Sequence, residues 1–333
     1  MVNQNANSRP ACQNQLQPAH RGLLSSGWLV CLTLSFLCCG IIRPVLAEEA
    51  QGSSSRTDRS AAQRAIPYDQ LEAHAKQKVS DILANVTIFR RLPTEKLQCD
   101  PELYLFLINR PDAVVNIWEV LGISDVALRQ TGRNSYRADD GNGTLADVEF
   151  LYRNHDCHLI LASGSYRGPL FNRQVRGKCL MLLRSNYQQG DDGRFSITHR
   201  LDVFCQLENA GAGLLAKTFQ PFVSKVADRN FVEISDFVST LFRKVERDIA
   251  WSQEIASRME NVHPSVREGF LKLSMRIAAQ NALQQSSLPP AATSQVVHLD
   301  TSAPIPLEAA PLEADWEHCG GDEDCSSFFE ACD

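Results

Sequence analysis

The stretch RFSITHRLDVFCQLE, residues 194–208, decides the fold class of this chain. From Phe195 to Cys205 every second residue is apolar, with His199 as the one exception. The residues between them are polar except Phe204. Alternation with a period of two is typical of a β-strand that has one face on a core. We therefore predict a half-buried strand here.

Working outward from this strand, five more strand-like segments precede it. Residues that favour turns separate them, in particular Asp139 to Gly143, Asn154 to Asp156 and Gln189 to Gly193. Such short connections predict antiparallel neighbours. The five segments are residues 124–130, 134–138, 145–153, 157–166 and 173–187.

A long helix is predicted directly after the six strands, from about residue 214 to 250, with a kink or restart at Pro221. Its apolar residues recur every three or four positions and form one stripe that can lie across a sheet. A strand that buries one face needs such a cover. The stripe consists of Phe231, Ile234, Val238, Leu241 and Val245.

Before the six strands, the chain predicts a helix over residues 68–84 and a first strand over 86–90. Two short helices follow, residues 102–109 and 113–121. Asp100 is placed to cap the first of these helices, and Gly122 to end the second. A final helix is predicted over residues 264–279. Residues 67–282 therefore form one α+β domain.

The N-terminal segment, residues 1–47, has the order of a secretory signal peptide. Basic residues come first, an apolar run follows over residues 27–42, and Val45 and Ala47 precede the expected cut. An uncleaved anchor is the alternative, because residues 22–47 could span a bilayer. The sequence thus predicts export to the periplasm or the extracellular space, or attachment to a membrane.

Three further segments read as unstructured. Residues 48–66 are small and polar without periodicity and predict a flexible spacer. Residues 283–314 are rich in Pro, Ala and Ser and predict a disordered linker. Residues 315–333 form an acidic tail that contains Cys319, Cys325 and Cys332.

The charge balance argues against nucleic acid as a partner. Residues 48–333 carry 30 basic and 39 acidic side chains, and nine of these acids lie in residues 306–333, where there is no Lys or Arg. Residues 48–305 are therefore formally neutral. A neutral domain lacks the basic surface that binding to a phosphate backbone requires.

Seven cysteines follow residue 47, an odd number, so at least one would stay free or pair between chains. Cys179 and Cys205 fall on adjacent predicted strands, in the apolar set of each. A turn centred near Gly190 would place Cys179 opposite Asp202, and a disulfide would then need a shift of register. We predict two free thiols, with the disulfide as the alternative.

The order of one strand, two short helices, six antiparallel strands and a long helix resembles the helix-grip fold of the START-like (SRPBCC) superfamily. The resemblance covers residues 86–250 and rests on element order, without a sequence motif. It implies a curved antiparallel sheet of about seven strands wrapped on the long C-terminal helix. Here an N-terminal helix and a further C-terminal helix would be added. The resemblance also implies an apolar cavity for a lipid or another hydrophobic molecule.

Alternation along the strands and the helical period give the residues expected to face that cavity. Among them, His199 could serve as a general base, although a hydrogen-bonded core histidine is the simpler interpretation. The predicted set is Val148, Phe150, Met181, Ile197, His199, Val203 and Phe231.

Other motifs carry little chemistry. His155, Asp156, Cys157 and His158 are potential ligands in a row, but strand geometry places His158 and Cys157 on opposite faces. We therefore predict no metal and no cofactor. No serine stands in a nucleophile-elbow motif, and no glycine-rich phosphate loop is present.

The sequence therefore predicts an exported, non-catalytic protein that binds a hydrophobic small molecule or lipid. One alternative is an interaction protein that recruits a protein partner through its acidic tail and terminal helices. A cyclase-like enzyme is the third interpretation.

Overall fold

The computed structural model describes residues 51–167, 174–208 and 212–287, with side chains in the last range from Ser224 onward. These residues belong to one unit of the chain. The predicted signal peptide or anchor, the linker and the acidic tail with its three cysteines lie outside them. Within the described residues, no helix is long and apolar enough to cross a membrane.

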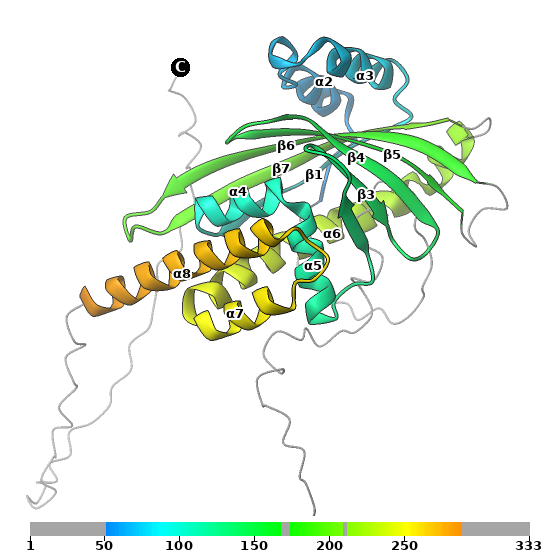
Figure 1. Cartoon of the computed structure of the whole chain (residues 1–333). Coiled ribbons are helices and arrows are strands. Elements are labelled where there is room, and N and C mark those ends of the chain that lie inside the picture. Colours follow the sequence, from blue (N-terminus) through cyan, green and yellow to red (C-terminus); the bar gives the residue numbers. More distant parts are fainter. Residues whose placement is uncertain (1–50, 168–173, 209–211, 288–333) are drawn as a thin grey trace, which may run out of the picture. The chain divides into compact units, whose positions relative to one another are not determined.

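A seven-stranded antiparallel sheet forms the centre of the fold (Figure 1). Its spatial order is β1-β7-β6-β5-β4-β3-β2, so the first strand lies at one edge of the sheet and pairs with the last strand. All six strands of the predicted meander are present within a few residues of their expected bounds. The strands are β1 (Ile88–Gln98), β2 (Ala127–Gln130), β3 (Ser135–Asp139), β4 (Thr144–Arg153), β5 (Cys157–Tyr166), β6 (Val175–Gln189) and β7 (Phe195–Leu207).

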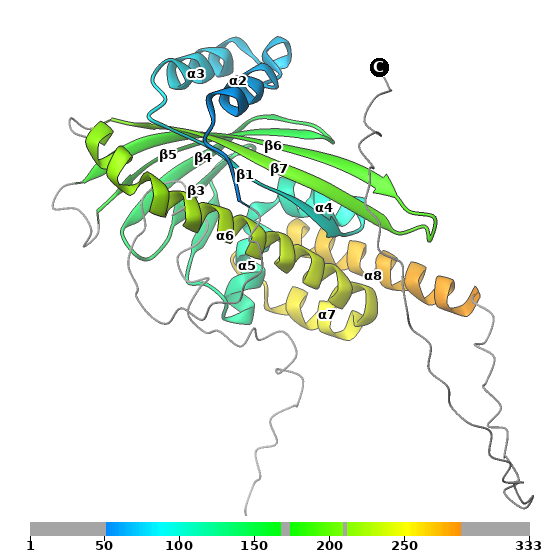
Figure 2. The ribbon, with the colours of Figure 1, turned by 180° about the vertical axis from the view of Figure 1, so that it is seen from behind.

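Helices lie on both faces of this sheet (Figures 1 and 2). On one face, called the outer face here, lie α2 (Arg56–Arg64) and α3 (Ala73–Ala84), joined through the 3-10 turn η2 (Tyr68–Gln70). Figure 2 shows α6 (Ala212–Arg247) running across the opposite, inner face. The remaining helices gather on the inner side: α4 (Pro101–Asn109), α5 (Pro111–Leu121), α7 (Ile249–Arg258) and α8 (Pro264–Ser287).

The local signals for the short helices work as predicted. Oδ1 of Asp100 accepts hydrogen bonds from the backbone N–H groups of Glu102 and Leu103, both at 3.0 Å, and so caps α4. Gly122 ends α5 with a φ of 66°, the left-handed conformation that glycine adopts without strain.

The inner face carries the larger core. The predicted stripe of α6 packs there, with Leu241 and Val245 almost fully buried. The helix is continuous through Pro221, so the predicted restart is wrong. It ends at Arg247, because Asp248 begins α7 by accepting a hydrogen bond from the backbone N–H of Trp251 at 2.9 Å.

The outer face has a core of its own. Leu159, Leu180, Leu182 and Phe204 point away from α6 and are fully buried in one cluster with residues of α2 and α3. Phe204, the exception to the polar set of β7, is therefore a core residue of the second face. The polar residues that alternate along β7 therefore make up only part of the outer face.

The prediction of a flexible spacer over residues 48–66 is wrong for residues 56–64, which form α2. Ser55 caps this helix by accepting a hydrogen bond from the backbone N–H of Asp58 at 3.0 Å. Ala62 and Ile66 are buried against the outer cluster. Tertiary burial of these two residues, rather than an apolar stripe, holds the helix in place.

The register of β6 and β7 corrects the cysteine prediction. Gln189 pairs with Phe195, so the turn is centred on Asp192 rather than Gly190. Cys179 then lies directly opposite Cys205, with 4.2 Å between their Cα atoms, and the two form a disulfide on the inner face. Cys99 and Cys157 are free.

Candidate ligand cavity

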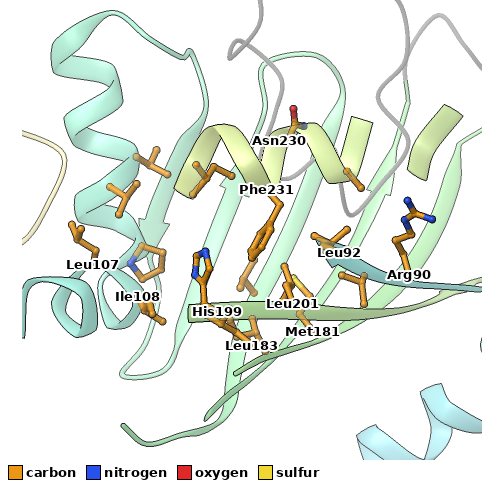
Figure 3. A pocket seen from close by; sticks show the side chains of 18 of the residues that line it. Arg90, Leu92, Leu107, Ile108, Met181, Leu183, His199, Leu201, Asn230 and Phe231 are labelled. Atoms are coloured by element: carbon orange, nitrogen blue, oxygen red, sulfur yellow. The ribbon is translucent and has the colours of Figure 1, made fainter. Parts of the chain in front are cut away.

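A cavity of about 210 Å³ lies between the inner face of the sheet and α6. Residues of α4 and α5 form one end of it, near Leu107 and Ile108, and Arg90 lies toward the other end (Figure 3). Phe231 of α6 projects into it between these ends. The cavity therefore occupies the space between the long helix and the concave side of the sheet.

Most of the side chains around this cavity are apolar. Arg90, Tyr104, His199, Ser224 and Asn230 are the polar ones among the described residues. The lining from the strands is Ile88, Arg90, Leu92, Leu128, Val148, Phe150, Ile160, Met181, Leu183, His199, Leu201, Val203, Cys205 and Leu207. Helices and loops add Tyr104, Leu107, Ile108, Pro111, Val114, Val115, Val126, Ser224, Ala227, Asn230, Phe231, Ile234 and Val238.

Six of the seven predicted cavity residues line this space. They are Val148, Phe150, Met181, His199, Val203 and Phe231. Ile197 is fully buried in the core on the same face but does not reach the cavity. Whether any of them binds a ligand stays a prediction.

Sequence reasoning missed the side chains that come from outside the meander. Tyr104, Leu107 and Val114 belong to α4 and α5, and a helical period alone does not say which strand a helix meets. Arg90 and Leu92 lie on β1, whose pairing with β7 shifts register between Arg91 and Thr94. Ile88, Arg90 and Leu92 keep the alternation up to that bulge, but the predicted strand ended at residue 90 and Arg90 is not an apolar residue.

One polar network interrupts the apolar lining. Nδ1 of His199 lies 2.9 Å from the hydroxyl of Tyr104, which lies 2.8 Å from the hydroxyl of Ser185. On the other side of the ring, Nε2 of His199 lies 2.8 Å from Oγ of Ser235 on α6. The Ser235 hydroxyl donates to the carbonyl oxygen of Phe231 at 2.8 Å.

One assignment of the protons satisfies every hydrogen-bond partner in this network. Because Ser235 donates to Phe231, its oxygen must accept from the Nε2–H of His199. Nδ1 is then unprotonated and accepts from Tyr104, whose oxygen accepts from Ser185. A neutral His199 satisfies all partners. Burial lowers the pKa of His199 to about 4 and raises the pKa of Tyr104 well above its ordinary value, which agrees with this assignment.

The end of the cavity near Arg90 is held by an ion pair. Nε of Arg90 donates to Oδ1 of Asp228 on α6 at 3.0 Å, and a second contact joins its Nη2 to Oδ2. The backbone N–H of Gly52 also donates to Asp228, at 2.9 Å. A Cβ at Gly52 would collide with the carbonyl oxygen of Arg91, so this close approach requires glycine. The ion pair ties β1 and the segment before α2 to the long helix.

The row from His155 to His158 does not form a metal site. The rings of His155 and Tyr187 lie 4.1 Å apart, and His155 pairs with Asp156 at the exposed tip of the β4–β5 hairpin. His158 points to the inner core and is fully buried. Among the described residues, no group of three or more His, Cys, Asp or Glu side chains could hold a metal ion.

Comparisons with known proteins find similarity among solved structures. No family model and no curated protein matches the chain. A conserved protein from Geobacillus kaustophilus is 14% identical, with 44% of this chain and 93% of that protein covered, at a TM-score of 0.30. DynU16, a protein in the dynemicin biosynthetic locus, is 18% identical, with 42% of this chain and 46% of its own covered, at a TM-score of 0.24. At these TM-scores the assignment to an α+β protein depends on the observed sheet and helices.

Proposed function

We propose that this chain is a helix-grip protein of the START-like type that binds a small hydrophobic molecule between its sheet and α6. The cavity under the long helix is the observation that supports this proposal most directly. Small-molecule sites are commonly apolar clefts with a few oriented polar groups, and this lining matches that description. The polar groups here are the His199 network and Arg90.

The size of the cavity narrows the class of ligand. A cavity of roughly 150 Å³ accepts benzene. A volume of about 210 Å³ therefore suits a compact apolar molecule, such as a small ring system or a short acyl chain, better than a diacyl lipid. A polar substituent on such a ligand would be placed near Tyr104 or Arg90.

Binding is favoured over catalysis by the state of His199. A general base needs a free nitrogen within reach of a substrate proton. Both nitrogens of His199 already contact protein hydroxyl groups, at 2.9 Å and 2.8 Å. We infer that the network fixes the position of Tyr104 and α6 against the sheet and presents a neutral polar surface to the ligand.

We also propose that the protein is exported. The basic, apolar and small-residue order of residues 1–47 supports export, and so does the disulfide between Cys179 and Cys205, because disulfides persist in oxidising compartments. Retention of residues 22–47 as an anchor is the alternative. N-terminal sequencing of the protein from its native membrane and soluble fractions separates the two.

Binding is tested with a matched pair of leucine substitutions. Leu201 lines the cavity, whereas Leu151 is partly buried against the outer cluster. We expect Leu201→Phe to fill part of the cavity and weaken binding of an environment-sensitive apolar dye by at least about tenfold, because overlap with the added ring excludes the dye. Leu151→Phe adds the same atoms on the other face and should leave dye binding unchanged.

Native mass spectrometry of the purified protein would identify a bound natural ligand. The proposal fails if no apolar molecule is carried through purification and the dye binds wild type and both variants with equal affinity. A dye bound only to exposed surface would give that second result.

A further inference from the structure

A second, polar groove of about 700 Å³ lies at the end of the sheet near the β4–β5 hairpin. Residues before η2 and within it form one wall, and the hairpin forms another. Hydrogen bonds hold these walls together: Nδ2 of Asn154 donates to the hydroxyl of Tyr152 at 3.0 Å, and Tyr152 contacts Gln70 of η2. The hydroxyl of Tyr187 donates to the carbonyl oxygen of His155 at 2.9 Å. These hydrogen bonds thus fix the positions of the groove walls relative to one another.

The floor of this groove is one row of residues across four strands. In the observed register, Cys157 of β5 pairs with Arg184 of β6, and Arg184 pairs with Arg200 of β7. Arg200 in turn pairs with Thr94 of β1. The row belongs to the outer face, as Leu182 and Phe204 do, because all are an even number of residues apart along their strands. Two arginines therefore stand directly opposite each other.

These two guanidinium groups lack strong partners. Among the described residues, Arg200 makes no hydrogen bond or ion pair, and the Nε atoms of both arginines are buried without a hydrogen-bond partner. The one ion pair of Arg184 is a contact of 3.8 Å with Asp202. Like charges directly opposite each other on adjacent strands destabilise a sheet. An anion between the two guanidinium groups would therefore stabilise this part of the sheet.

The acids near the row are already engaged elsewhere. Asp202 is fully buried and accepts from Nε of Arg91 at 2.6 Å. Asp58 of α2 also pairs with Arg91. Asp156 is exposed and pairs with His155. The half-buried cluster thus has three arginines against two carboxylates, and Arg200 makes no ion pair with either of them.

We propose that Arg184 and Arg200 bind a doubly charged oxyanion in this groove, with the phosphate group of a small phosphomonoester as the ligand. Two adjacent guanidinium groups present planar sets of donors that match phosphate oxygens. The walls offer aromatic rings and side-chain amides, including Tyr152, Asn154 and Asn186, to the organic part of such a ligand. Arg184 and Arg200 do not line the apolar cavity, although His199 borders both spaces, and the proposed anion site does not depend on the function of that cavity.

One electrostatic detail agrees with this site. Burial and the nearby charges of Arg184 and Arg91 lower the pKa of Arg200. Desolvation is the largest cause, repulsion by the two arginines adds to it, and the charges of Asp202 and Asp58 oppose it. Guanidinium groups keep their charge in proteins nonetheless, so the repulsion persists. A bound phosphate dianion would remove that repulsion.

The test is thermal unfolding of the full chain in chloride buffer, with inorganic phosphate exchanged for chloride at constant ionic strength. We expect phosphate at about ten times its dissociation constant to raise the unfolding midpoint of wild type by about 3 °C. Arg200→Gln should lose this response and, without phosphate, should unfold at or above the wild-type temperature because the repulsion is relieved.

Arg176→Gln is the matched control. Arg176 lies on the same strand and the same face as Arg184 but is exposed and outside the groove. This variant should respond to phosphate as wild type does. Arg184→Gln is the second site variant and should also lose the response. Should one site variant fail to fold, the other still gives the comparison, and broadening of the phosphorus resonance of inorganic phosphate by wild type and by Arg176→Gln but not by that variant is a second readout.

The proposal is overturned if phosphate leaves the wild-type midpoint unchanged, or if it stabilises wild type and all three variants alike. Stabilisation by succinate without stabilisation by phosphate would also overturn it, because the site would then take dicarboxylates. None of these results bears on dye binding in the apolar cavity, so the two proposals fail separately.

Discussion

The two faces of strands β5, β6 and β7 differ in how they use alternate residues of the same chain segments. The outer face is filled by Leu159, Leu180, Leu182 and Phe204, all fully buried under α2 and α3. Toward the hairpin end it becomes charged. The inner face, by contrast, leaves space under α6, and His199 on this face lies in a network of neutral hydroxyl groups. The outer face is therefore close-packed, whereas the inner face borders a cavity.

A substitution in the charged part of the outer face should have the largest effect on the free energy of unfolding. Asp202 has no exposed surface and neutralises Arg91 and part of Arg184. Asp202→Asn should cost about 3–5 kcal/mol in the free energy of unfolding, because it removes a fully buried carboxylate and leaves Arg91 with Asp58 as its remaining counterion. Urea unfolding measures this cost.

On the inner face, Tyr104→Phe removes a neutral hydroxyl from the network and should cost only about 1 kcal/mol. Equal costs for the two variants would contradict the distinction between the charged part of the outer face and the neutral His199 network of the inner face.

Two neighbouring leucines of β6 allow the packing of the outer face to be compared with that of the inner face. Leu182 is fully buried on the outer face, and Leu183 is half-buried and lines the inner cavity. Leu182→Ala should cost about 3–4 kcal/mol in the free energy of unfolding, since it opens a void in a close-packed cluster. Leu183→Ala should cost about 1–2 kcal/mol, because it only enlarges an existing space. Both substitutions lie in the same strand, so the change in strand propensity is the same for each. If Leu183→Ala cost more than Leu182→Ala, this result would show that the cavity is closed in solution.

The smallest effect is a pH dependence that belongs to the inner face. Burial lowers the pKa of both His158 and His199 to about 4, and for His158 the charges of Arg153 and His155 add to the effect. The unfolded histidines take up protons near pH 6.5, whereas the folded ones stay neutral until about pH 4. Their contribution to stability is therefore complete above pH 6.5 and is lost as the pH falls toward 4.

Each histidine should account for about 1 kcal/mol of the stability lost between pH 7 and pH 5.5. His158 has both ring nitrogens buried without a partner, so His158→Phe should not destabilise the protein at pH 7 and should remove about half of this pH dependence. Urea unfolding at the two pH values checks the prediction, and exposed His74 provides the control substitution, His74→Phe. An unchanged slope in His158→Phe would contradict the assignment.

Much of the sheet could be predicted because its signals are local. Alternation in the strands and the turn residues between them predicted all six strands of the meander. Alternation also predicted five cavity residues, and the helical period predicted a sixth, Phe231. The polar partners of His199 could not be found, since Tyr104 and Ser235 lie far from it in sequence and meet it only in the fold.

The cover of the outer face was missed for a related reason. Its helix α2 has few apolar residues, and only the spacing of Ser55 and Asp58 marks its start. Two apolar residues, Phe204 and Leu151, stand at positions where the alternation predicted polar ones. They indicated that the outer face also has a core. Leu151 packs against that core next to a bulge in β4.

The pairing of β1 with β7 has a consequence for the order in which the protein folds. The hydroxyl of Thr87, just before β1, donates to the carbonyl oxygen of Cys205 across a separation of 118 residues. Contacts between segments so distant in sequence close a large loop and form slowly. During synthesis, β1 and the helices before it must wait until β7 has been made, and the apolar residues of α3 stay exposed to solvent or chaperones until then. The strand that begins the sheet is therefore among its last parts to join it.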